Sequence, residues 1–117
     1  EMERWRRHWV GVVDGGVVVV SELAQEGVMW TGDGARQIRA HVEFSESFRA
    51  APILQVNLSM WDIASQTNAR ADVQAEDITE DGFVIVFRTW GDTKIARVRV
   101  AWQAIGELRQ ADEWELY

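Results

Sequence analysis

The chain has 117 residues, the length of one domain, and its 47% hydrophobic and 26% charged residues form a globular composition that excludes a disordered chain. Its net charge of −7 repels phosphate backbones, so nucleic acid is not an expected partner. No cysteine is present, which excludes disulfides, a thiol nucleophile and a cysteine-bound metal, and no apolar run is long enough for membrane insertion.

The N-terminal segment at 1–10 is charged and lacks a long apolar core, so we expect no secretory signal in it. The first predicted strand is the apolar run GVVVVS at 16–21. A glycine-rich loop, TGDGAR at 31–36, leads into QIRAHVEF at 37–44. Apolar and polar residues alternate along that second run, which is typical of an antiparallel strand with one face on a core and one in water.

The same alternation predicts three further strands, at 52–60, 69–76 and 94–105. The run FVIVFRTW at 83–90 differs because it is apolar on both faces, as is the run at 16–21. Both runs therefore require cover on both sides, either from a second sheet or from another subunit. About six strands joined by short polar turns indicate an all-β fold, an antiparallel β-sandwich.

We find no internal repeat, low-complexity segment or linker, which favours a single folded domain. We place this domain at 11–106, between the N-terminal segment at 1–10 and a C-terminal tail at 107–117. The tail has weak helical spacing and is expected to form a short helix or an arm.

Catalytic patterns are scarce in this sequence. Four acids crowd the turn at 76–82, where charge runs are usually solvated, and no serine elbow, phosphate loop or zinc helix motif occurs. His8 and His41 form no ligand pair, and His41 falls on the polar face of a predicted strand. We therefore expect a non-enzymatic protein without metal or cofactor; a glycoside hydrolase, which needs two facing carboxylates, is the enzymatic alternative.

Three residues have the chemistry of a sugar site. Asp33 lies between two glycines, Arg70 lies on the polar face of a predicted strand, and Trp90 ends an apolar strand. A carboxylate and a guanidinium can each bind vicinal hydroxyls, while an indole stacks on the C–H face of a pyranose. Each residue also has an ordinary interpretation, as an Asx turn, a surface charge or the edge of a core.

Order and spacing along 11–105 carry a family resemblance that no single residue would carry. The chain resembles the H-type lectins, the family of the snail agglutinins and of the C-terminal domain of the slime-mould discoidins. The residues that carry the resemblance are Leu58, Asp62, Asn68, Arg70, Gly82, Phe83, Thr89, Trp90, Thr93, Lys94 and Trp102.

The resemblance implies a six-stranded β-sandwich that assembles as a trimer, with sugar sites between neighbouring subunits that favour galactose or N-acetylgalactosamine. By position, Asp33 matches the loop aspartate that holds sugar hydroxyls. Arg70 matches an arginine from the adjacent subunit, and Trp90 matches the tryptophan beside the sugar.

The chain departs from the snail pattern at several site positions. Gly91 replaces a histidine and Ala96 replaces a tyrosine, and both changes remove contacts and open the site. Thr31 also differs from the snail loop, and Trp30 is a candidate replacement aromatic surface. The snail protein joins two trimers through disulfides, so any hexamer of this cysteine-free chain requires non-covalent stacking.

We thus expect a metal-independent lectin that binds galactose- or N-acetylgalactosamine-type glycans and forms a homo-trimer or hexamer. Its expected setting is multivalent cell adhesion at an extracellular or particle surface, as a bacterial or phage-like member of the family. The alternative is a structural trimerisation or fibre module whose sugar site has degenerated.

Overall fold

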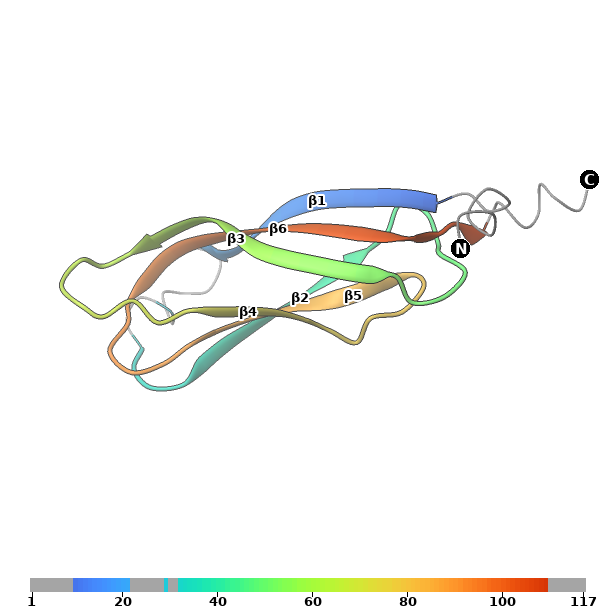
Figure 1. The fold of residues 1–117 in the computed structure, drawn as a ribbon. Coiled ribbons are helices and arrows are strands. Elements are labelled where there is room, and N and C mark those ends of the chain that lie inside the picture. Colours follow the sequence, from blue (N-terminus) through green and yellow to red (C-terminus); the bar gives the residue numbers. More distant parts are fainter. Residues whose placement is uncertain (1–9, 22–28, 30–31, 110–117) are drawn as a thin grey trace, which may run out of the picture.

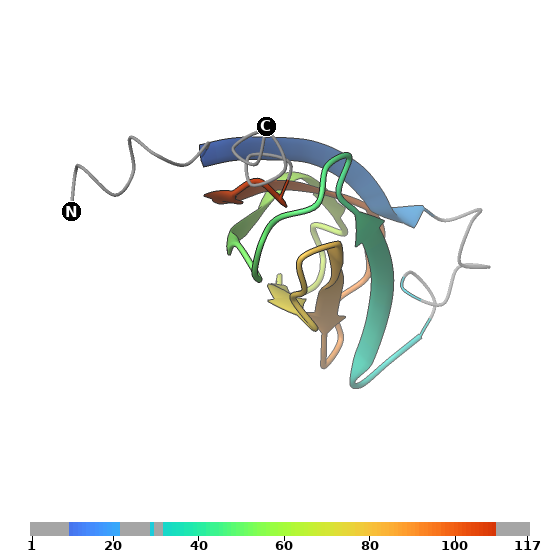
Figure 2. The ribbon, with the colours of Figure 1, turned by 90° about the vertical axis from the view of Figure 1, so that its right-hand side faces the viewer.

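The computed structural model describes residues 10–21, 29 and 32–109, which form two three-stranded antiparallel sheets packed face to face (Figure 1). One sheet has the order β1-β6-β3 and the other the order β2-β5-β4, and the view along the molecule shows the two layers (Figure 2). The predicted all-β class and the six strands are confirmed. The strands are β1 (Val10–Ser21), β2 (Arg36–Glu43), β3 (Ile53–Ile63), β4 (Asp72–Glu76), β5 (Gly82–Thr89) and β6 (Ile95–Glu107).

Two strand boundaries differ from the prediction. β1 begins at Val10, six residues before the predicted start, because it pairs with β6 along its whole length, including the segment Asp14–Gly15–Gly16. β4 begins only at Asp72, because the backbone before it bonds to side chains instead of to a neighbouring strand: the Arg70 N–H donates to the Thr93 hydroxyl at 3.2 Å. The predicted helix or arm in the tail falls outside the described residues beyond Arg109.

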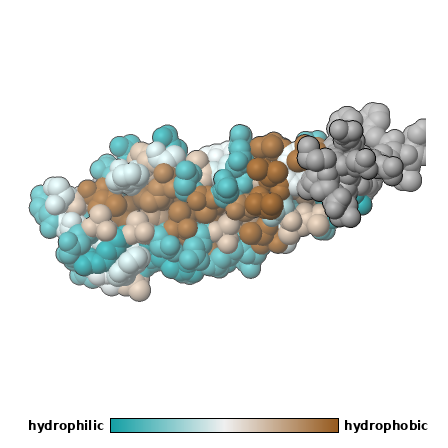
Figure 3. Space-filling model, in the orientation of Figure 1, coloured by the Kyte–Doolittle hydropathy of each residue, from teal (hydrophilic) through white to brown (hydrophobic). Residues whose placement is uncertain are grey.

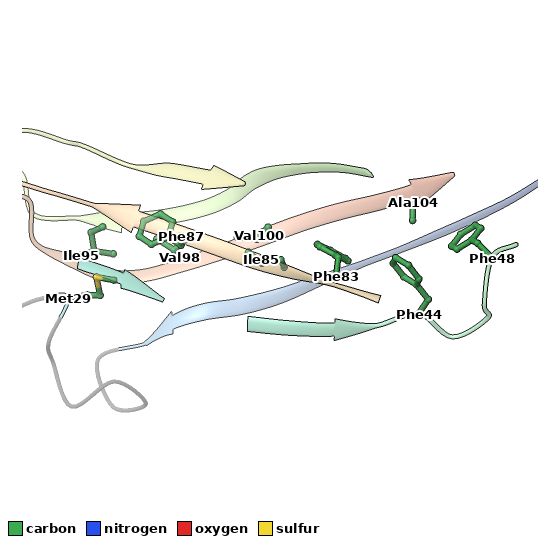
Figure 4. Close-up of a cluster of buried hydrophobic side chains, with 10 residues drawn as sticks. All are labelled: Met29, Phe44, Phe48, Phe83, Ile85, Phe87, Ile95, Val98, Val100 and Ala104. Carbon is green, nitrogen blue, oxygen red and sulfur yellow. The ribbon is translucent and has the colours of Figure 1, made fainter. Parts of the chain in front are cut away.

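The core lies between the sheets and is built from the inward faces of β5 and β6 (Figure 4). The alternation of side chains along a strand explains this core. Every second residue of β6 from Val98 to Ala104 points inward, as the sequence predicts. At the end where β6 finishes, aromatic rings fill the space, with Phe44 stacked on Phe83 at 5.8 Å and Trp102 5.4 Å from Phe83. Such contacts add about 0.5–1.5 kcal/mol per pair beyond area burial.

The outer face of β5 is covered within the same chain. Val84 and Val86 point away from the core but are only 3% and 0% exposed. Arg39 of β2 and Glu76 of β4 reach across the central strand and form an ion pair at 3.2 Å, which places polar side chains over these valines. Of the two alternatives for covering the run at 83–90, cover within the sandwich therefore holds, because the opposite sheet covers one face and side chains of its two neighbouring strands cover the other. The side chains of 18–21 lie outside the description, so the cover of the run at 16–21 stays a prediction.

Apolar side chains remain exposed on the outer face of the other sheet. Val12 and Ile53 are 57% and 70% exposed, and both are Cα partners of Ile105, so the three residues form one row across β1, β6 and β3. Figure 3 shows hydrophobic residues gathered toward the end of the molecule where β1 begins. We call Val12, Ile53 and Ile105 the apolar row.

Within the described ranges, no helix is long and apolar enough to cross a membrane.

Candidate functional site

The strand order brings the three predicted site residues to one end of a sheet. β5 lies between β2 and β4, and both neighbours begin where β5 ends. Asp33 precedes β2, Arg70 precedes β4 and Trp90 follows β5, so Trp90 lies between the other two. This end of the sheet is therefore the candidate site.

The turn at 91–94 fastens the loop that carries Asp33. The Gly34 N–H donates to the Gly91 carbonyl at 2.9 Å. The Arg36 guanidinium donates to the carbonyls of Gly34 at 2.9 Å and Thr93 at 2.8 Å. Charge-assisted bonds of this kind are stronger than neutral ones, so the loop before β2 is held against the turn.

Asp33 is presented to solvent and held by one cation. Its side chain is 79% exposed, and Lys94 Nζ donates to Asp33 Oδ1 at 2.9 Å and to the Gly32 carbonyl at 2.7 Å. The hydrogen bond from Lys94, together with its charge, holds the pKa of Asp33 below its ordinary value. Asp33 is thus ionised at neutral pH, and Oδ2 has no hydrogen-bond partner among the described residues.

Arg70 is held on the other side of the same turn. Its Nη1 donates to Asp92 Oδ1 at 2.5 Å, and its carbonyl accepts the Thr89 hydroxyl. The guanidinium lies against Gly91, where an added Cβ would be 3.0 Å from Nη1. Gly91 also has φ +69°, a conformation that favours glycine. Backbone conformation and the arginine packed against it therefore explain why glycine occupies position 91.

Trp90 lies beside a cavity. Its side chain is 46% exposed and lines a cavity of about 350 Å³ together with residues at the start of β2 and the end of β5. Small-molecule sites are concave and lined largely by apolar and aromatic side chains. The position of Trp90 at the end of its strand therefore fits the floor of a binding groove, and it is not part of the core.

Other predicted site features do not meet in one chain. Asp33 and Arg70 precede the strands on opposite sides of β5, and each has its own charged partner. Trp30 and Thr31 lie outside the described residues. Ala96 is only 7% exposed, so its short side chain is covered.

Sequence reasoning missed the residues that hold the site. The sequence indicated Lys94 only as part of a family pattern, and it gave no role to Asp92. The two residues flank Thr93 with opposite charges. Gln37 and Arg88 line the cavity but contact neither Asp33 nor Arg70, and the sequence indicated them only as strand residues. The pattern D-T-K after a strand-end tryptophan was the available signal for Lys94 and Asp92.

The described part of the chain has no cluster of three histidine or acidic residues placed to hold a metal ion.

One prediction concerns Lys94 alone. In Lys94→Met, we expect the pKa of Asp33 to rise toward the ordinary aspartate value of about 4, because the charge and hydrogen bond that favour the carboxylate are lost. The measurement is a carboxyl-carbon NMR titration of Asp33. Lys94→Arg is the matched control and should retain a lowered pKa; equal pKa values in the wild type and in Lys94→Met would refute this coupling.

Comparison with known proteins identifies the family. The H-type lectin domain model matches residues 39–105, more than half of the chain. A protein of Fuscovulum blasticum described as "ATP synthase subunits region ORF 7" is 51% identical over 107 residues, which cover 92% of this chain and 93% of that protein. A discoidin-1 protein of Dictyostelium discoideum is 36% identical over 70 residues, which cover 59% of this chain and 28% of that protein.

The fold comparison agrees. Discoidin II of Dictyostelium discoideum has a similar structure, with a TM-score of 0.73 and 25% identity, covering 84% of this chain and 37% of the discoidin II protein. A tailspike protein of a Pseudomonas phage shares the fold at a TM-score of 0.52 and 17% identity. The chain thus spans little more than a third of the length of discoidin II. The chain belongs to the H-type lectin domain family, as its sequence pattern predicted, and its class is that of a carbohydrate-binding lectin.

Proposed function

We propose that this lectin binds galactose- or N-acetylgalactosamine-type sugars at sites shared between neighbouring subunits of a trimer. The observation that carries the proposal is the arrangement around Trp90. An oriented carboxylate, Asp33, lies on one side of it and an oriented guanidinium, Arg70, on the other.

The chemistry of the two groups is complementary. Asp33 offers only acceptors and Arg70 offers only donors, whereas a sugar hydroxyl both donates and accepts. Adjacent hydroxyls can therefore bind Asp33 of one chain and Arg70 of its neighbour while a C–H face of the ring stacks on Trp90. Lys94 and Asp92 each bind one edge of their partner and fix its direction before the sugar arrives.

The placement of these groups on opposite flanks of β5 supports a site shared between subunits. In a closed ring of three copies, every subunit presents one flank to the next, so the Asp33 flank of one copy can meet the Arg70 flank of its neighbour. The apolar row of Val12, Ile53 and Ile105 offers surface that a second copy can bury. Two such trimers stacked without disulfides would give the hexamer.

Assembly determines how useful a weak site becomes. A single millimolar sugar site is worth roughly 4 kcal/mol, and linking three or six of them on one particle raises avidity by about 10²–10⁴. We therefore propose multivalent, metal-independent adhesion to glycan-coated surfaces, without catalysis. The glycan-coated surface supplies the repeated ligands, and the trimer or hexamer supplies the repeated sites.

A glycan array combined with light scattering tests this function. We expect a trimer or hexamer at micromolar concentration and binding to galactose- or N-acetylgalactosamine-terminated glycans that persists in EDTA. A stable monomer would refute the shared sites, and loss of binding in EDTA that calcium restores would refute metal independence.

A structural fibre module is the second candidate. Its support is the likeness to a phage tailspike, which at 17% identity concerns the fold alone, and the missing histidine at Gly91. A trimer that binds no glycan on the array would favour this candidate over the lectin function.

A further inference from the structure

The cavity beside Trp90 has a mostly apolar lining, to which Gln37 and Arg88 add polar groups. It opens on the outer face of the sheet β2-β5-β4 and extends from Trp90 to the rung formed by Gln37 and Arg88, which are Cα partners. Its volume of about 350 Å³ falls at the lower end of the range for small-ligand sites.

Gln37 is free to bind a ligand. Its side chain is exposed on the outer face of β2, and its amide has no hydrogen-bond partner among the described residues. A primary amide offers both donors and an acceptor, which matches a sugar hydroxyl. Gln37 can therefore bind a hydroxyl without first breaking a contact within the protein.

Arg88 is already oriented. Its Nη2 donates to Glu76 Oε2 at 2.9 Å, and its Nη1 lies 3.9 Å from Asp72 Oδ2. A guanidinium has five N–H groups, so these contacts leave donors that can reach into the cavity. Because carboxylates of β4 hold the Arg88 guanidinium in place, a ligand does not have to order this side chain when it binds.

The positive charge of Arg88 is offset by neighbouring carboxylates. Glu76 is ionised at neutral pH because its hydrogen bond from Arg88, followed by that from Arg39, lowers its pKa. Glu76 and Asp72 together offset the positive charge of Arg88, and the Arg36 guanidinium, which also lines the cavity, donates to backbone carbonyls. The remaining donors suit neutral hydroxyls.

We propose that this cavity is a second subsite, which holds a neutral sugar residue linked to the galactose-type sugar bound at Trp90. The inference rests on the proposed function, and it makes the ligand a glycan of at least two linked residues. Trp90 and Arg88 are two residues apart on an extended segment, a spacing of about 7 Å that offsets the second ring from the first. Gln37 and Arg88 would then determine which linkages bind best.

Calorimetric titration tests the second subsite. The probes are methyl galactoside and a panel of neutral disaccharides that carry galactose at the non-reducing end and differ in linkage. We expect at least one disaccharide to bind about 5-fold more tightly than methyl galactoside, the gain of one or two neutral hydrogen bonds. In Gln37→Ala this gain should disappear while the affinity for methyl galactoside stays unchanged.

Gln74→Ala is the matched control, because Gln74 lies on the same face of the sheet, on β4 opposite Val86 and outside the cavity. It should retain the gain. Arg88→Lys keeps the charge but removes the fork and should weaken only the disaccharide. If no disaccharide exceeds methyl galactoside, or if both cavity variants keep the gain, the second subsite is refuted and the lectin function stands. If the wild type binds none of the probes, the proposed function itself fails, and the subsite with it.

Discussion

Asp33→Ala is expected to abolish detectable galactose binding while the protein stays folded. Charge-assisted hydrogen bonds contribute about 1.5–3 kcal/mol each, and the binding free energy of a millimolar sugar is only about 4 kcal/mol. The side chain is 79% exposed, so its loss leaves no cavity in the core. The measurement is calorimetric titration of galactose-type sugars into the folded variant, checked by circular dichroism.

Glu80→Ala is the matched control for this experiment. Glu80 is an exposed carboxylate with one ion pair, to Arg109 at 3.1 Å, and it lies at the opposite end of the sandwich. Its removal should leave sugar affinity unchanged. Unchanged affinity in Asp33→Ala, in contrast, would remove the proposed site from this protein and favour the fibre module.

Mixed trimers extend this test to the shared site. Arg70→Ala should also lose binding, since each site draws Asp33 from one chain and Arg70 from the next. When the two variants are unfolded together and reassembled in equal amounts, each required residue is intact in half of the chains. About a quarter of the sites should then be intact. A mixture that binds no better than either variant would contradict sharing between subunits.

Phe87→Ala is expected to cost about 3–5 kcal/mol in the free energy of unfolding, the usual loss for a fully buried phenylalanine. Phe87 is 0% exposed and lies on the inner face of the central strand, between Ile38 and Val73. Because the strands on both sides contact this ring, the cavity left behind cannot close without moving the sheet. Urea denaturation followed by tryptophan fluorescence measures the loss.

Trp61→Ala provides the comparison. Trp61 is larger than Phe87 but is 61% exposed on an edge strand, so its removal should change the free energy of unfolding by less than about 1 kcal/mol. If the two variants lost similar stability, the position of Phe87 in the core would be wrong.

Most of the fold could be predicted because side-chain alternation is a local property. The runs at 37–44 and 94–105 show it clearly, and both are strands with the predicted faces inward. The early start of β1 could not be predicted, because Asp14–Gly15–Gly16 resembles a turn and becomes a strand only through pairing with β6. For β5, the sequence left open whether a second sheet or another subunit covers the outer face, and only the strand order shows that long polar side chains of β2 and β4 cover it.

The candidate site could be predicted only in part, for a similar reason. Asp33 and Trp90 were visible from the glycines around one and the strand before the other. The groups that hold the site are not visible in this way, since Lys94 and Asp33 are 61 positions apart in the chain and meet only because β2 begins where β5 ends. Gln37 and Arg88 likewise become neighbours only through sheet register.

The antiparallel arrangement also separates the proposed site from the outer ends of the longest strands. β6 begins beside Lys94 and finishes at Glu107, where Val10 pairs with it, about 40 Å away along the strand (Figure 1). A fluorophore, a surface tether or a second protein attached at Val10 or Arg109 would therefore lie at the end of the sandwich opposite the turn at 91–94. A molecule immobilised in this way would keep the proposed sugar site exposed to solvent at the end opposite the attachment point.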